Sequence, residues 1–133
     1  MPGLMLDTNI CVHIRRSRDP KVRARFESVP IGAAVMSVVT YGELRLYVDK
    51  SGSTDQVERL TRLTSMIPVL PLGASVGDAY GRIRADLERR GALIGGNDLW
   101  IAAHALALGL TLVTANVREF ALVPDLVVED WTT

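Results

Sequence analysis

Short apolar runs that alternate with longer amphipathic segments constrain the fold of this sequence more than any other feature. Five runs have the length and composition of buried strands, at residues 4–6, 33–36, 67–72, 110–113 and 126–128. The proline-containing run at 67–72 is expected near a sheet edge, because proline cannot donate a hydrogen bond to a neighbouring strand. Strands that alternate with helices predict a mainly parallel sheet covered on both faces, which is a three-layer α/β/α sandwich.

Capping residues predict where the helices between these strands begin. Asp19, which precedes a proline, is typical of an N-cap, and Ser37 is expected to cap a helix that runs to about residue 48 and carries Glu43. Further helices are expected at residues 55–66, 75–90 and 99–108. Asn97 and Asp98 are the expected caps of the last of these helices.

Length and composition predict one folded domain over residues 1–133. The 133 residues are 48% hydrophobic and 23% charged, the balance of a globular chain with a sizeable core. No apolar stretch approaches the roughly 20 residues that span a bilayer, and an acidic residue comes too early for a signal peptide. A cytoplasmic protein without membrane association is therefore expected, and the lone Cys11 agrees with a reducing compartment.

The charges balance globally but not locally. Fifteen basic and fifteen acidic residues give no net charge and hence no general attraction to nucleic acid. Six of the basic residues nevertheless lie within eleven positions: Arg15, Arg16, Arg18, Lys21, Arg23 and Arg25. Arginine suits phosphate and carboxylate alike, so the cluster is either a solvated pair of helices or a contact surface for RNA.

Three isolated carboxylates in or beside apolar segments suggest a metal site. Asp7 ends the first run, Asp98 precedes an apolar helix, and Glu43 lies in the helix after the second run. Each alone could be a turn, a cap or a solvated residue. Carboxylates gathered from distant segments are, however, the ligands that Mg²⁺ and Mn²⁺ prefer. The carboxyl ends of parallel strands are also where ligands collect in such folds.

Five motifs in order resemble one family along essentially the whole chain. They are MLDTNI at 5–10, YGEL at 41–44, NDLWIAAHA at 97–105, LVTANVREF at 112–120 and VVEDW at 127–131. In these motifs the sequence is similar to PIN-domain nucleases, and in particular to VapC-type toxins of bacterial type II toxin–antitoxin pairs. The resemblance implies a PIN-like fold over the single domain.

The resemblance also implies an endoribonuclease that depends on Mg²⁺ or Mn²⁺. Asp7, Asp98 and Glu43 match the acidic residues that would hold the metal and act in catalysis. A divalent cation can lower the pKa of a bound water, orient that water and stabilise the leaving oxygen of a phosphodiester, so no histidine or serine nucleophile is required. Residues that could orient the carboxylates are Thr8, Asn9 and Thr114.

The sequence departs from the family pattern at Asn116. Many PIN domains carry a fourth acid at this position, and an amide supplies a neutral oxygen in place of a charge. Glu119, three residues later, could reach the site instead or could be an ordinary solvated acid. The sequence therefore leaves open whether Asn116 or Glu119 completes the site and whether one or two metal ions act there.

The resemblance implies several partners. A VapB-type antitoxin would block the acidic site, the toxin would form a homodimer and a hetero-oligomer with the antitoxin, and promoter DNA would be bound only through the antitoxin. The substrate class suggested by the terminal motifs is tRNA, with initiator tRNA as one candidate.

Two alternatives of other classes remain at this stage. One is a catalytically degenerate PIN module that binds RNA or antitoxin without cutting, for which Asn116 is the main argument. The other is a haloacid-dehalogenase-like phosphatase, because a first strand followed by an aspartate is also found there. The phosphatase alternative lacks the second aspartate, since Asn9 stands at its place.

Overall fold

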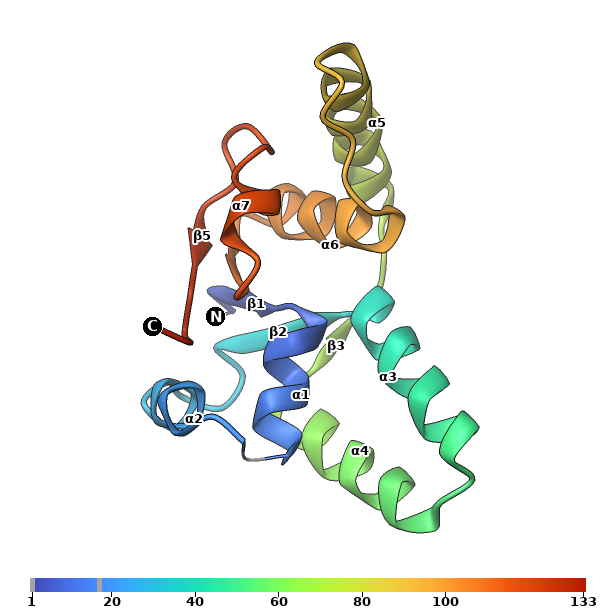
Figure 1. The fold of residues 1–133 in the computed structure, drawn as a ribbon, viewed down its shortest axis with the longest axis vertical. Helices are drawn as coiled ribbons and strands as arrows, with labels where there is room; N and C mark the ends of the chain where they lie inside the picture. Colours follow the sequence, from blue (N-terminus) through green and yellow to red (C-terminus); the bar gives the residue numbers. More distant parts are fainter. Residues whose placement is uncertain (1, 17) are drawn as a thin grey trace.

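Five short strands form one all-parallel sheet in the computed structural model, which describes residues 2–16 and 18–133 (Figure 1). The strands are β1 (Leu4–Leu6), β2 (Ala34–Ser37), β3 (Val69–Leu70), β4 (Thr111–Val113) and β5 (Val128–Glu129). Their order in the sheet is β3-β2-β1-β4-β5, so β1 is central and β3 is an edge strand, as predicted for the proline-containing run. The predicted α/β class with a mainly parallel sheet is confirmed.

Helices cover both faces of this sheet. They are α1 (Thr8–Arg16), α2 (Pro20–Glu27), α3 (Val38–Ser51), α4 (Thr54–Met66), α5 (Ala74–Arg89), α6 (Gly96–Ala107) and α7 (Val117–Phe120). The buried residues of α5 and α6 and Phe120 of α7 belong to one apolar core, whereas the buried residues of α1, α2, α3 and α4 belong to a second core. The result is the three-layer sandwich that the alternation of strands and helices predicts.

Alternation along the central strands separates the two cores. Successive side chains of a strand point to opposite faces of the sheet. Met5 and Leu112 lie in the core with α5 and α6, whereas their neighbours Leu6 and Val113 lie in the core with α1 and α4. All four are fully buried, which explains why these strands are continuous apolar runs in the sequence.

Several predicted helix ends are observed. The Asp19 carboxylate accepts hydrogen bonds from backbone N–H groups at the start of α2, and the Ser37 hydroxyl accepts one from the Val39 N–H at 3.1 Å. Gly109 follows α6 with a φ of +68°, a conformation that glycine adopts without strain.

Other predicted boundaries are wrong. Helix α6 begins at Gly96 with Gly95 as its N-cap, so neither Asn97 nor Asp98 is the cap. The Gly95 carbonyl accepts the Leu99 N–H at 2.8 Å, which starts the first turn earlier and places Asp98 inside it. Helix α3 continues to Ser51, and α7 follows β4 without having been predicted.

The carboxyl ends of the central strands lie at one edge of the sheet. Asp7 follows β1, Ser37 ends β2 and Thr114 follows β4, and all three are buried. Near the end of the chain, the buried Trp131 donates its indole N–H to Glu129, which also pairs with Arg25 of α2. No helix in the described part of the chain is long and apolar enough to cross a membrane.

Candidate active site

Asp7 and Thr114 meet because their strands are neighbours in register. Leu6 of β1 pairs with Val113 of β4, so the residues that follow them lie side by side. The Thr114 hydroxyl donates a hydrogen bond to one oxygen of the Asp7 carboxylate. The other oxygen accepts the backbone N–H of Ile10 at 3.1 Å, at the start of α1. Asp7 is therefore fixed at the N-terminus of a helix, where the helix dipole favours negative charge.

Glu43 is held from a different direction. Ser37 caps α3, and Glu43 lies in the second turn of that helix and is half-buried. Its carboxylate accepts the Thr8 hydroxyl at 2.7 Å. The hydroxyl of Thr40, one turn earlier on α3, lies 3.3 Å from the same Thr8 oxygen. Thr8 thus connects the first turn of α1 to α3 and fixes the carboxylate beside the sheet edge.

Asp98 and Glu119 form the third part of the site. Asp98 lies in the first turn of α6, and Glu119 lies on α7. The two carboxyl groups share a hydrogen bond. Glu119 also accepts the Gly95 backbone N–H at 3.2 Å and the side-chain amide of Asn116. Asn116 in turn donates its backbone N–H to the Thr114 hydroxyl at 3.0 Å, which links this pair to Asp7.

The negative charges of these four acids interact with one another. Burial, the hydrogen bond to Glu119 and the negative charges of Glu119, Asp7 and Glu43 raise the pKa of Asp98 to about 7. Burial also raises the pKa of Asp7, although the hydrogen bonds from Thr114 and Ile10 act in the opposite direction. The site therefore holds more negative charge than its hydrogen-bond donors neutralise.

The sequence matches the model of a known family over most of its length. The family model described as "PIN domain" matches residues 4–126. This chain belongs to the PIN-domain family. The resemblance stated from the five motifs is therefore confirmed.

Full-length relatives place this PIN domain among the VapC ribonucleases. Ribonuclease VapC2 of Rickettsia felis is 37% identical, with 96% of each chain covered. The tRNA(fMet)-specific endonuclease VapC of Shigella flexneri is 39% identical, with 99% of this chain and 100% of that protein covered. A crystal structure of VapBC2 from Rickettsia felis bound to a DNA fragment from their promoter has a TM-score of 0.89 and 34% identity, covering 96% and 98% of the two chains. The predicted ribonuclease of the VapC group is confirmed.

The PIN fold brings most of the residues singled out in the sequence to one place. Asp7, Glu43, Asp98 and Glu119 interact electrostatically. Residues that support them through hydrogen bonds are Thr8, Thr114 and Asn116. Asn9 differs, because it contributes its backbone N–H to Asp7 while the residue itself is exposed.

One participating residue was not anticipated from the sequence. Thr40 is fully buried and contacts Thr8, three residues before Glu43 on the same helix. That spacing puts Thr40 and Glu43 on one face of α3, so the signal was present in the helical periodicity. The Gly95 donor was also not predicted, because every residue except proline has a backbone N–H and the residue type does not show which of them donates to the site.

The donor set fits a divalent cation. Carboxylate oxygens are hard ligands, and carboxylates from the end of β1 and from α3, α6 and α7 interact through their charges. Among residues 2–16 and 18–133, no three His, Cys, Asp or Glu side chains form a ready-made metal ligand group. A cation bound here would therefore draw these carboxylates closer together.

Proposed function

We propose that this VapC-type PIN domain is an endoribonuclease that uses Mg²⁺ or Mn²⁺ and cleaves tRNA, with initiator tRNA as the first candidate. The observation that carries the proposal is the charge interaction of Asp98 with Glu119, Asp7 and Glu43, which adds to burial and to the hydrogen bond with Glu119 in raising the pKa of Asp98 to about 7. A cation would relieve that repulsion, which is the usual reason for gathering acids at a phosphodiester-cleaving site.

In this proposal Asp7, Asp98 and Glu43 hold the metal and are the catalytic residues. The bound cation would supply an activated water and would stabilise charge on the scissile phosphate. The surrounding residues hold the carboxylates in place: the Thr114 hydroxyl fixes Asp7, and the Thr8 hydroxyl fixes Glu43. Such orienting hydrogen bonds reduce the entropy lost when a ligand set closes on its ion.

The contacts of Asn116 favour an active enzyme over the degenerate-module alternative. Its amide donates to one Glu119 oxygen while the Gly95 N–H donates to the other. Glu119 therefore takes the place of the fourth acid, and Asn116 positions it. The phosphatase alternative has no support, because the family match is to PIN domains.

The proposal of a tRNA substrate is supported by relatives. The similar proteins of Shigella flexneri and Salmonella typhimurium, at 39% and 34% identity over nearly their whole lengths, are named tRNA(fMet)-specific endonucleases. Because RNA specificity is read from unpaired loops, the anticodon stem-loop is the expected target region.

The proposed partner is a VapB-type antitoxin. Solved structures of similar chains are VapBC complexes, two of them with DNA. An arginine from the antitoxin would be attracted to the excess negative charge around Asp98 and would block RNA access. We also propose, as the resemblance implies, that the chain forms a homodimer and a hetero-oligomer with the antitoxin. It would contact promoter DNA only through the antitoxin and would reside in the cytoplasm.

Metal-dependent cleavage of purified tRNAs tests the proposal. The antitoxin-free chain is incubated with initiator and elongator methionine tRNA in Mg²⁺, in Mn²⁺ and in EDTA, and 5′ ends are mapped. D98N is compared with D78N, a matched change at an exposed aspartate of α5. Discrete cuts that require metal, persist in D78N and vanish in D98N are expected.

Two results would contradict parts of the proposal. Cleavage that continues in EDTA or in D98N would refute the carboxylate metal site. Equal cleavage of both methionine tRNAs, or of neither while another RNA is cut, would refute the initiator-tRNA assignment but leave the ribonuclease assignment in place.

A further inference from the structure

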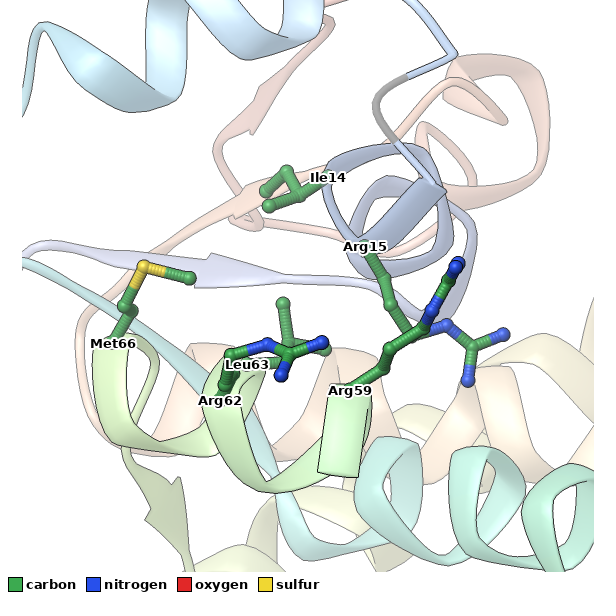
Figure 2. Close-up of a pocket in the computed structure, with 6 residues that line it drawn as sticks. All are labelled: Ile14, Arg15, Arg59, Arg62, Leu63 and Met66. Carbon is green, nitrogen blue, oxygen red and sulfur yellow. The ribbon is translucent and has the colours of Figure 1, made fainter. Parts of the chain in front are cut away.

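An arginine-lined cavity lies between α1 and α4, apart from the four acids. It encloses about 250 Å³ and is lined by Ile14, Arg15, Arg59, Arg62, Leu63 and Met66 (Figure 2). Arg15 comes from α1, whereas Arg59 and Arg62 come from α4. Half of the lining side chains are guanidinium groups and none is acidic, so the cavity is suited to an anion.

The arginines of this cavity are only partly satisfied. The Nε and one terminal nitrogen of Arg15 are buried and have no hydrogen-bond partner among the described residues. Burial and the positive charges of Arg16 and Arg59 lower the pKa of Arg15. Arg59 pairs with Asp55 at 3.1 Å, but within residues 2–16 and 18–133 neither Arg15 nor Arg62 forms an ion pair. The guanidinium groups of Arg59 and Arg62 are exposed at the cavity and can donate to the oxygens of an anion, whose charge would also offset the positive charge of the partly buried Arg15.

Helices α1 and α3 connect this cavity to the acidic site. Thr8 and Arg15 stand at opposite ends of α1, roughly 10 Å apart along the helix axis at 1.5 Å per residue. On α3, Tyr47 lies one turn after Glu43 and therefore on the same face. The guanidinium groups of Arg15 and Arg16 lie 5.0 and 5.3 Å from the centre of the Tyr47 ring.

Tyr47 gives this connection an exposed aromatic surface. Its side chain is 45% exposed, and its hydroxyl accepts a hydrogen bond from Arg16 at 2.8 Å. Exposed aromatic rings flanked by guanidinium groups are typical contacts for unpaired bases and the adjoining phosphates. Glu43 and Tyr47 thus lie along α3, and Arg15 and Arg16 at the end of α1 lie beside Tyr47.

We propose that the cavity of Arg15, Arg59 and Arg62 binds backbone phosphate of the RNA substrate away from the cleaved bond, with Tyr47 contacting the intervening nucleotides. This inference rests on the proposed ribonuclease function. The apolar side chains of Ile14, Leu63 and Met66 provide a wall for the sugar or base that accompanies the phosphate.

RNA binding by an R59Q/R62Q double variant tests the inference. Both arginines are exposed, so the variant should fold, and an unchanged thermal transition verifies this. R84Q is the matched control, because Arg84 on α5 also pairs with a carboxylate four residues away. Binding of fluorescein-labelled initiator tRNA is measured by anisotropy in EDTA over a range of salt concentrations, and kcat and KM are then measured with Mg²⁺.

The double variant should raise Kd and KM about tenfold and lower the slope of log Kd against log salt by about 1.4, or about 0.7 per lost phosphate contact. The value of kcat should stay within about twofold of wild type, because the arginines do not contact the reacting phosphate. R84Q should match wild type. R15Q and Y47A, measured next, should weaken binding in the same way.

Values of Kd, KM and salt slope equal to those of R84Q would overturn the inference. Unchanged RNA binding together with weakened binding of the antitoxin would overturn it as well and assign the cavity to an acidic protein segment. Failure of the proposed function is distinguishable, because the wild-type chain would then cleave no RNA with either metal, whereas the binding measurement in EDTA does not depend on cleavage.

Discussion

Replacing Asp98 with asparagine should abolish cleavage and, in the absence of metal, make the protein more stable. Asparagine keeps a hydrogen bond to Glu119 but removes one of four mutually repelling charges. The fold therefore carries a cost at this position that only the function explains, which is the usual relation between stability and activity at a site of clustered charge.

The size of this effect follows from the pKa of Asp98. A rise from 3.8 to about 7 corresponds to about 4 kcal/mol at about 1.4 kcal/mol per pKa unit. Because Asp98 is only half-buried, solvent screens much of that energy, and a gain of about 1–2 kcal/mol is expected for D98N. For a chain of this length the gain is roughly 3–6 °C in Tm.

The difference in the free energy of unfolding between D98N and wild type depends on pH. A carboxyl group whose pKa is raised in the folded state stabilises the protein fully below its unfolded pKa and loses that contribution as pH rises through about 7. D98N and wild type should therefore have similar free energies of unfolding at pH 4. The difference should grow with pH and reach its full value by about pH 8.

Urea unfolding in EDTA, followed by circular dichroism at pH 4 and pH 8, measures the difference. D78N on α5 is the control and should match wild type at both pH values. Adding Mn²⁺ at pH 8 should stabilise wild type more than D98N, because a ligand stabilises only the state that binds it. If D98N is less stable than wild type at pH 8 without metal, then burial and repulsion do not raise the pKa of Asp98 as inferred here.

Two other changes test the support of the site, and a third tests a buried histidine of α6. T114V removes a donor from the buried Asp7 carboxylate and should cost about 1–3 kcal/mol in urea unfolding and lower kcat, whereas T114S should retain both. N116A frees Glu119 from its amide donor and should weaken Mn²⁺ binding in calorimetry severalfold, with no change expected for N97A as the control. Burial lowers the pKa of His104, so its contribution to stability is complete above about pH 6.5 and is lost as pH falls. The free energy of unfolding of wild type minus that of H104N should therefore shrink from pH 7.5 to pH 5. A difference that stays constant would contradict this.

The sequence could predict the parts of the site that depend on regular structure. Asp7 and Thr114 each follow an apolar run, and the ends of neighbouring parallel strands must meet at one edge. The position of Glu43 could be predicted because Ser37 marks the start of its helix, and helical periodicity then fixes the face on which the carboxylate lies.

The parts that depend on tertiary contacts could not be predicted. The role of Glu119 requires α7, a four-residue helix too short to leave a periodic signal. The start of α6 was misplaced because two glycines precede Asn97, and glycine caps a helix without a side-chain signature. Strands β3 and β5 contain two residues each, so their bounds are set by pairing with β2 and β4.

The excess negative charge of the four acids connects metal binding, pH and inhibition in the proposed function. Hydrogen bonds from Thr8, Thr114 and Asn116 partly neutralise Glu43, Asp7 and Glu119. The repulsion that remains can be relieved by a proton on Asp98, by a divalent cation or by the arginine of an antitoxin. Because all three act on the same charge, each should weaken the binding of the other two. Metal affinity should therefore rise with pH through about 7, and antitoxin release should become easier as the metal concentration increases.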